Sequence, residues 1–276
     1  MKPAPFDYIR CDHVDEALEA LHRHGEEARI IAGGQSLVAM LNMRLVQPSL
    51  LVDISRIGAL KKLDASAKTF RVNAAVTQSE LLAWKSLAGH APLLARAMPF
   101  IGHVQTRNRG TVCGSLAHAD PSSELPLVAV LLNATIHLAG KNDNRSIAAR
   151  DFFIGLLETS RRPDELLTAV EVPICDAGRE GFAFDEVAMR HGDFAIIAMA
   201  VRATRDTLTI GVGGASSKPE VREFALLEGT ALDDALNAFA WELPMQDDVH
   251  ASARYRRDLV RRLGPRLVME ARQCLN

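Results

Sequence analysis

The chain has 276 residues and a formal net charge of −2, with 48% hydrophobic and 24% charged residues. That balance is typical of a globular protein that folds in water around a sizeable core, without a stapling metal or disulfide. A chain so close to neutrality has no global basic field, which argues against nucleic acid or an anionic membrane as its main partner.

The four cysteines are widely separated, at Cys11, Cys113, Cys175 and Cys274. No two of them have a Cys-x-x-Cys spacing, so neither a zinc site nor an iron–sulfur cluster is predicted within this chain. Free thiols in a reducing cytosol are the simpler interpretation. The first residues lack the apolar stretch of a signal peptide, and no apolar run approaches the ~20 residues that span a bilayer. We therefore expect a cytoplasmic protein with no membrane span.

Helix and strand signals alternate in the first third of the chain. Asp12 is the predicted N-cap of a helix whose apolar face runs to Leu21, and Gly25 is predicted to terminate that helix. The pattern that follows is a strand, a Gly-Gly break, a helix and a second strand, at residues 29–32, 33–34, 35–45 and 50–54.

The middle of the chain begins with an alternating strand at 68–76. Thr77 and Glu80 have the spacing of a capping box, which predicts a helix continuing through Trp84. A further helix is expected at about 92–98.

Residues 102–123 are rich in small and polar side chains and lack clear periodicity. So long an irregular stretch inside a domain is usually functional. Asp120 and Pro121 then read as the N-cap and first residue of a helix with an apolar body at 125–132. Two strands are predicted after it, at 134–139 and 166–172.

The pattern changes after residues 173–181, which are rich in Pro, Gly and Asp and form the candidate domain boundary. Gly264-Pro265 is expected to kink or break the last helix. The predicted elements are three antiparallel strands at 182–189, 195–203 and 207–212, and two helices at 231–241 and 252–273. A run of strands followed by helices argues for an α+β domain.

The first glycine motif, at residues 32–37, follows a predicted strand and precedes a predicted helix. Two glycines allow successive backbone N–H groups to converge, and the helix N-terminus adds a partial positive charge, which together favour a phosphate or pyrophosphate. The alternative is a tight connection with no ligand. The Rossmann pattern Gly-x-Gly-x-x-Gly is absent.

The second segment, 101–121, concentrates glycines, hydroxyls and small residues that let the backbone approach a flat or phosphorylated ligand. A polar surface loop is the alternative interpretation. No carboxylate pair or Ser/His/Asp set suggests acid–base or acyl-transfer chemistry, so no catalytic residue and no metal ligand is assigned.

These two segments resemble the FAD-binding medium subunit of the molybdenum hydroxylases, a family that includes the carbon monoxide dehydrogenase medium subunit and the flavin portion of xanthine dehydrogenase. The resemblance rests on Ala-Gly-Gly-Gln-Ser-Leu at 32–37 and on Thr-Arg-Asn-Arg-Gly-Thr-Val-Cys-Gly-Ser-Leu-Ala-His-Ala-Asp-Pro at 106–121. Weaker matches at 2–8, 50–54, 190–195 and 251–257 extend it over nearly the whole chain.

The resemblance implies an α+β protein with the two-subdomain FAD-binding fold of the vanillyl-alcohol-oxidase-like, or PCMH, type. Residues 1–175 would form the FAD-binding domain, with subdomains at about 1–56 and 57–175. Residues 176–276 would form a small C-terminal α+β domain.

The resemblance also implies which residues bind FAD. The first motif wraps the pyrophosphate, which here places Ala32, Gly33, Gly34, Gln35, Ser36 and Leu37 at the cofactor. The second motif approaches the other side of the pyrophosphate and the flavin, with Thr111, Val112, Cys113, Gly114 and Ser115; Asp120 is assigned to the same set. Glu124 matches an acidic position near the adenosine ribose, and Leu167 matches a strand position whose backbone lies beside the isoalloxazine.

The chain departs from the family pattern at the second motif and before the Arg-x-Gly-Asp run. Cys113 replaces a common Gly, and a small buried thiol is the simplest interpretation. Some relatives have a Lys that contacts the flavin where this chain has Asp185 and Glu186, which predicts a more acidic flavin environment.

By resemblance, the chain is an FAD-binding electron-transfer subunit. A small partner subunit would carry two [2Fe–2S] clusters and a large one the molybdenum–pterin cofactor, in a dimer of heterotrimers that passes electrons to an external acceptor. Two alternatives are a self-sufficient FAD oxidase or dehydrogenase of the same fold and a non-redox phosphate-ligand-binding assembly protein. The basic run Arg254, Arg256, Arg257, Arg261 and Arg262 reads as a solvated helix face, or as a partner contact in a multi-subunit enzyme.

Overall fold

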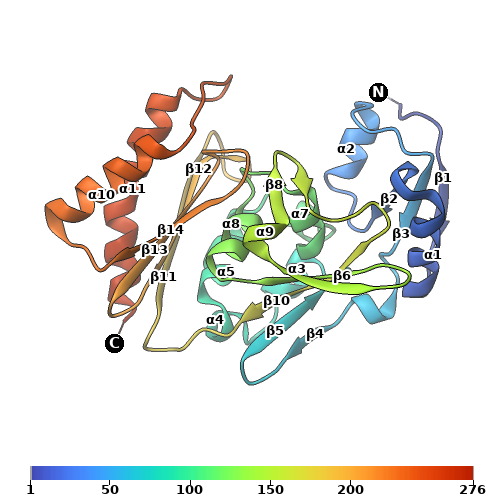
Figure 1. Ribbon diagram of the computed structural model, residues 1–276, viewed down its shortest axis with the longest axis horizontal. Coiled ribbons are helices and arrows are strands. Elements are labelled where there is room, and N and C mark those ends of the chain that lie inside the picture. Colours follow the sequence, from blue (N-terminus) through green and yellow to red (C-terminus); the bar gives the residue numbers. More distant parts are fainter. Residues whose placement is uncertain (1, 276) are drawn as a thin grey trace.

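Three β-sheets follow one another along the long axis of the molecule, each built mainly from one stretch of the chain (Figure 1). The computed structural model describes residues 2–275. The molecule has the α+β composition that the sequence predicts. Short 3₁₀ turns occur at Gly25–Glu27, Gly58–Leu60 and Met98–Phe100.

The first sheet contains three parallel strands in the order β1-β3-β2. The elements of this region are β1 (Asp7–Arg10), α1 (Val14–His24), β2 (Ala28–Ile31), α2 (Leu37–Asn42) and β3 (Leu50–Asp53). This confirms the predicted strand, Gly-Gly, helix and strand unit. Gly25 ends α1 with φ +53°, also as predicted. The predicted Asp12 cap is wrong: His13 occupies the N-cap position, and the Asp12 N–H instead donates to the Glu16 carboxylate at 2.9 Å.

The second sheet has five strands in the order β4-β5-β10-β6-β7, with antiparallel neighbours. These are β4 (Leu63–Ala65), β5 (Thr69–Asn73), β6 (Thr135–Ala139), β7 (Asn144–Ala148) and β10 (Leu166–Pro173). A small two-stranded sheet joins β8 (Phe153–Gly155) to β9 (Glu158–Thr159).

Helices cover the side of this sheet that faces the rest of the molecule (Figure 1). They are α3 (Gln78–Leu82), α4 (Leu87–His90), α5 (Pro92–Ala97), α6 (Val104–Arg107), α7 (Val112–His118), α8 (Glu124–Leu131) and α9 (Ala149–Phe152). The Thr77–Glu80 capping box is confirmed, with the Glu80 N–H donating to Thr77 Oγ1 at 3.2 Å, but α3 ends before Trp84.

The predicted irregular segment therefore contains two short helices, and the helix after it begins later than expected. Asp120 is not its N-cap, because the Asp120 carboxylate accepts from the Ser122 N–H at 2.9 Å and closes a separate turn. Ser123 occupies the N-cap position, and α8 starts at Glu124.

The third sheet is an antiparallel meander, β11-β12-β13-β14, with α10 and α11 on its outer face (Figure 1). Its elements are β11 (Gly181–Ala188), β12 (Ala195–Ala203), β13 (Thr207–Gly213), β14 (Glu220–Ala225), α10 (Gly229–Glu242) and α11 (Ala253–Gln273). Side chains alternate between its faces: Phe182 and Phe184 join the core shared with the first two sheets, and Ala183 faces the core beneath α10 and α11. The sequence did not predict β14.

The last helix continues through Pro265, so of the predicted kink or break the break does not occur. Gly264 explains part of this, because a Cβ at that position would lie 2.7 Å from a methyl group of Leu236, so α10 packs directly against the helix there. Burial of Leu259, Val260, Leu267 and Val268 on either side offsets the lost backbone hydrogen bond. Among residues 2–275, no helix has both the length and the apolarity needed to cross a bilayer.

Candidate functional site

The first glycine motif forms the turn between β2 and α2. Gly34 has φ +72°, a left-handed conformation that glycine adopts without strain. The Val38 N–H donates to the Gly34 carbonyl at 3.0 Å, and the Gln35 amide donates to the Gly33 carbonyl at 3.2 Å. Within residues 2–275, the backbone N–H groups of 34–36 have no acceptor. The turn from Ala32 to Leu37 therefore offers free donors at the start of a helix, which suits an anion.

The second motif opens α7. Thr111 is its N-cap and is buried, and its Oγ1 accepts from the Gly114 N–H at 3.0 Å. Gly114 is exposed, and Ser115 Oγ lies 3.1 Å from the hydroxyl of Ser123. Val112 and Cys113 point into the core. The cap thus presents small residues outward while the apolar ones hold the helix in place.

The two motifs touch through their backbones. A Cβ placed on Gly33 would lie 2.1 Å from the carbonyl oxygen of Arg109, far inside contact distance. The Val112 N–H donates to the Val76 carbonyl at 3.2 Å, which ties the second motif to the connection between β5 and α3. The structure therefore brings together the two segments that the sequence singled out, and Gly33 is the residue that permits their contact.

Gln78 is a residue at this junction that sequence reasoning missed. Its backbone N–H donates to the Gly110 carbonyl at 2.8 Å, and its side chain is only 4% exposed. A Cβ on Gly110 would lie 3.1 Å from Gln78 Oε1, an atom that has no hydrogen-bond partner within residues 2–275. A buried amide oxygen without a donor costs folding free energy, so this junction contains an unsatisfied polar atom. In the sequence Gln78 is an ordinary first residue of a helix, so no signal distinguishes it.

Cys113 fits without intruding on the exposed side of the motif. Its side chain is 2% exposed, and its Sγ donates to the Val72 carbonyl at 3.4 Å. Burial raises the pKa of this thiol to about 12. The replacement of the family's common Gly is therefore accommodated by turning the thiol into the core between α7 and β5, where it is unreactive.

Glu124, at the start of α8, is 5% exposed, and its charge acts on a second carboxyl group, that of Glu186 on β11 of the third sheet. Burial raises the pKa of Glu124 to about 7, and the charge of Asp120 adds to the shift. Burial likewise raises the pKa of Glu186 to about 8, with further contributions from Glu124 and Asp185. Asp185 itself is paired with Arg266. Of the two acidic residues before the Arg-x-Gly-Asp run, Asp185 is thus in an ion pair, and the half-buried Glu186 is coupled by charge to the buried Glu124.

We expect stability to fall as pH rises through the range in which this pair ionises. Both acids have folded pKa values above their ordinary value of 4.5, so the folded state binds more protons than the unfolded state between about pH 4.5 and 8. The Glu124→Gln variant should match the wild type near pH 4.5 and exceed its free energy of unfolding by up to roughly 3 kcal/mol above pH 8. Urea unfolding of the FAD-free protein at both pH values measures this. The same change at the exposed Glu26 is the control, and an equal gain at both pH values would contradict the acid-pair interpretation.

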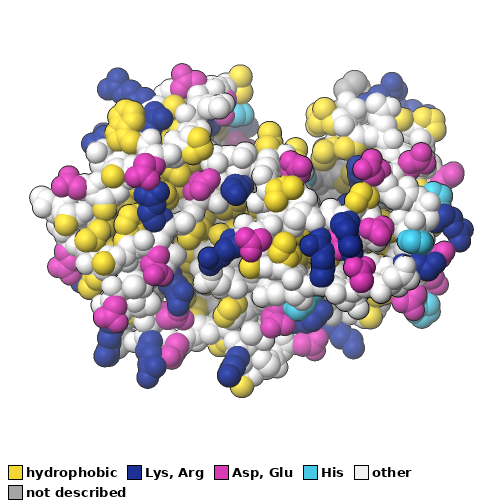
Figure 2. All heavy atoms as spheres, viewed as in Figure 1, with side chains coloured by type: hydrophobic (Ala, Val, Ile, Leu, Met, Phe, Trp, Pro, Cys, Tyr) yellow, Lys and Arg dark blue, Asp and Glu magenta, His cyan; other side chains and the backbone are white. Residues whose placement is uncertain are grey.

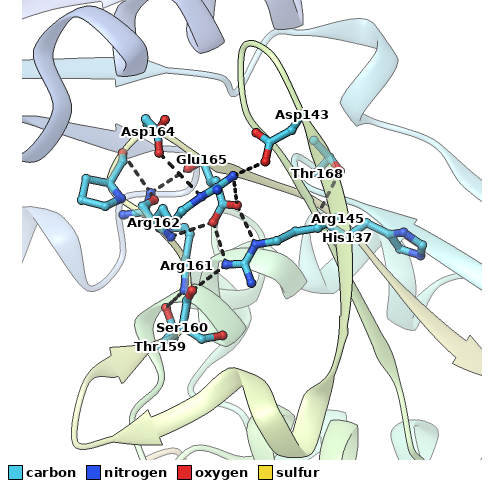
Figure 3. Close-up of polar contacts among 11 residues, drawn as sticks. His137, Asp143, Arg145, Thr159, Ser160, Arg161, Arg162, Asp164, Glu165 and Thr168 are labelled. Atoms are coloured by element: carbon cyan, nitrogen blue, oxygen red, sulfur yellow. Dashed lines mark hydrogen bonds and ion pairs between the residues drawn. The ribbon is translucent and has the colours of Figure 1, made fainter.

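Leu167 lies on β10, the central strand of the second sheet, and its side chain is buried. The register with β6 shifts between Leu167 and Ala169, so the ladder is interrupted there. The Thr168 hydroxyl donates to the His137 carbonyl at 3.2 Å across this irregularity (Figure 3). The backbone at Leu167 is thus less regular than that of its neighbours, as suits a strand that contacts a ligand.

A buried ion-pair network holds the segment just before Leu167. Glu165 is fully buried and accepts from Arg145 Nε at 2.7 Å and from Arg145 Nη2 at 2.9 Å (Figure 3). Arg162 adds a backbone N–H at 2.7 Å and a guanidinium contact at 2.9 Å, and it also pairs with Asp143 at 2.6 Å. Burial by itself would raise the pKa of Glu165, but the hydrogen bonds from Arg145 and Arg162 outweigh it and hold that pKa below its usual value.

A hollow lies at the upper edge of the molecule, between α2 and the central helices (Figures 1 and 2). Apolar side chains are visible on both sides of it in Figure 2. The first motif leads directly into α2, which forms one side of this hollow (Figure 1). Apolar walls with a few backbone donors suit a flat ring system joined to phosphates.

Comparison with known proteins agrees with this geometry. Residues 4–175 match the family described as the FAD binding domain in molybdopterin dehydrogenase. The chain is 37% identical to the 6-hydroxypseudooxynicotine dehydrogenase complex subunit alpha of Paenarthrobacter nicotinovorans, over 98% of this chain and 96% of that one. It is 35% identical to the carbon monoxide dehydrogenase medium chain of Afipia carboxidovorans, over 84% and 83% respectively. A chain of reconstituted carbon monoxide dehydrogenase from Oligotropha carboxidovorans superimposes with a TM-score of 0.94 and 30% identity, covering 99% of both chains.

Proposed function

Because this chain belongs to the family of FAD-binding domains of molybdopterin dehydrogenases, we propose that it is the medium, electron-transferring subunit of a multi-subunit molybdenum hydroxylase. A single observation carries the proposal most directly. The contact of Gly33 with the Arg109 carbonyl joins two glycine motifs into one cradle with unused backbone donors. Such a cradle fits a pyrophosphate flanked by a flat ring.

In this proposal the residues of the first motif, Ala32–Leu37, hold the pyrophosphate of FAD through backbone N–H groups. The second motif lies along its other side, with Gly114 and Ser115 toward the surface and the buried Thr111 capping the helix. Val112 and Cys113 contribute through the backbone, because their side chains are buried. The proposed set also includes Asp120, Glu124 and Leu167. Glu124 is only 5% exposed, so packing around it fixes the position of its carboxyl group.

When bound, FAD supplies exchange between one-electron and two-electron carriers. The chain's own residues bind and orient the cofactor, exclude water on the core side, and fix the charge around it. We propose that electrons arrive from the [2Fe–2S] clusters of a small partner subunit and leave to an external acceptor, in a cytoplasmic dimer of heterotrimers whose large subunit holds the molybdenum–pterin cofactor.

An absorption spectrum of the purified chain, with the cofactor released by heat and identified, tests the proposal. Flavin bands and release of intact FAD are expected, and anaerobic addition of the reduced iron–sulfur subunit should bleach the flavin bands. A chain that loads FAD only beside its partners would mean that assembly completes the site. A well-folded chain that stays colourless with added FAD, both alone and with partner subunits, would refute the proposal.

A further inference from the structure

The outer face of the C-terminal helices carries a group of side chains that the proposed FAD site does not use. We call it the Arg257 patch, and it consists of Trp241 at the end of α10 and of Arg254, Arg257 and Arg261 near the start of α11. The three arginines are spaced by three and four residues, so they share one face of α11. Trp241 is 64% exposed. In Figure 2, apolar and basic side chains adjoin at the upper left, where α10 ends and α11 begins.

The guanidinium group of Arg257 has an aromatic contact, but one of its hydrogen-bond donors lacks an acceptor. Its guanidinium carbon lies 4.7 Å from the centre of the Trp241 ring, a cation–π contact. Its Nε is shielded from water and has no hydrogen-bond partner within residues 2–275. A donor buried in this way without an acceptor costs free energy.

The charge around the patch is not balanced within the chain. Seven arginines against Asp258 and Glu270 give α11 a net of five positive charges, in a chain whose net charge is −2. Arg254 and Arg257 have no carboxylate within 4.0 Å in the described part of the chain. The nearby acidic side chains already have partners. Asp247 accepts from the Ala253 N–H at 2.6 Å, and Asp248 pairs with Arg256 at 2.7 Å. Asp258 pairs with Arg261 at 3.3 Å, and Glu242 pairs with Arg222.

The patch lies away from the two glycine motifs. Helices α10 and α11 pack on one face of the third sheet, and α8 packs on the other, toward the proposed cofactor site (Figure 1). A role in binding the flavin is therefore excluded by position. Tryptophan and arginine are the residue types that dominate the energetics of protein–protein contacts.

We propose that the Arg257 patch docks a carboxylate-bearing surface of a partner subunit, with Trp241 as the apolar anchor and Arg254 and Arg257 as the cations it pairs with. The inference rests on the proposed function, which supplies the partner subunits. The carboxylate of the partner would pair with the terminal nitrogens of Arg257, because Nε is buried within this chain. A charge-assisted contact of this kind is weakened by salt if it is exposed at the rim of the interface.

The test co-expresses the full chain with the iron–sulfur and molybdopterin subunits of its own complex and measures subunit stoichiometry and FAD content after affinity purification. Trp241→Ala and Arg257→Glu should weaken association by at least about tenfold, with Arg254→Glu weaker in effect. Arg257→Lys should restore part of the loss. FAD per chain should not change. Arg205→Glu, a charge reversal at the exposed turn between β12 and β13, is the matched control.

Wild-type recovery of both subunits by Trp241→Ala and Arg257→Glu would overturn the inference. So would sedimentation showing that the chain alone self-associates and that Arg257→Glu abolishes this, because a second copy would then occupy the patch. If the wild-type chain holds FAD but recruits no subunit, the inference fails and FAD binding stands. If it neither holds FAD nor recruits a subunit, the proposed function itself fails.

Discussion

Replacing Gly33 by alanine is expected to abolish FAD loading while leaving most of the fold intact. The new Cβ would lie 2.1 Å from the Arg109 carbonyl oxygen, 2.7 Å from its carbon and 2.8 Å from the Gly110 Cα. All three are backbone atoms, so no side-chain rotation relieves the clash and the two motifs must separate. Because both motifs line the proposed pyrophosphate site, we expect the Kd for FAD to rise by a factor on the order of 100 or more, about 2.7 kcal/mol.

Fluorescence titration of the FAD-free variant with FAD measures the change in Kd, and thermal unfolding reports how much stability is lost. Gly58→Ala is the control, because a Cβ on Gly58 meets nothing within 4 Å. That variant should bind FAD as the wild type does. Unchanged affinity in Gly33→Ala would remove the first motif from the proposed site, whereas loss of binding together with global unfolding would leave only the packing role of Gly33.

Elements with strong local signals were predictable from the sequence. The first motif lies in a unit of strand, Gly-Gly turn, helix and strand. Apolar runs mark its two strands, and Gly33 and Gly34 mark the turn. The capping box at Thr77 is likewise a local contact. Edge strands lack such signals: every residue of β1 is exposed, and no residue of β14 is fully buried. Their formation depends on a neighbouring strand that the local sequence does not reveal.

Local competition explains the mistakes at helix starts. Asp120, Ser122 and Ser123 are all good N-cap residues, and the choice among them depends on the turn that the Asp120 carboxylate closes. At Pro265 the local rule allows the helix to end, but burial of apolar residues on both sides of the proline favours its continuation. The first case is thus a competition between local turns, and in the second a tertiary contact outweighs a local preference.

The sequence reveals the two segments that form the candidate site, but not how they come together. Both glycine motifs are visible as composition and as family resemblance. Their contact at Gly33, and the burial of Gln78 beside Gly110, arise only when distant parts of the chain pack together. The partner of Glu124 is hidden in the same way, because Glu186 lies on a strand of the third sheet.

Glu165 is the clearest instance of an interaction invisible to the sequence and is expected to have the largest effect on stability. The stretch Arg161–Glu165 reads as a polar surface loop, yet the Glu165 carboxylate is fully buried between Arg145 and Arg162 (Figure 3). Removing its charge leaves the Arg145 guanidinium without a carboxylate partner within residues 2–275, whereas Arg162 keeps Asp143. We expect Glu165→Gln to lose about 3–5 kcal/mol of unfolding free energy, the range measured for breaking one partner of a buried ion pair.

Urea unfolding at neutral pH tests this, with Asp176→Asn as the matched control. Asp176 pairs with Arg179 at 3.5 Å on the surface, so that variant should change by less than about 1 kcal/mol. The sign of the pH dependence gives an independent check. The folded pKa of Glu165 is lowered, so its contribution is present above the unfolded value and is lost as pH falls through the folded one. The difference between wild type and Glu165→Gln should therefore shrink in acid. A difference that stays constant with pH would mean that the glutamine disturbs packing at the start of β10 rather than removing a charge that the arginines require.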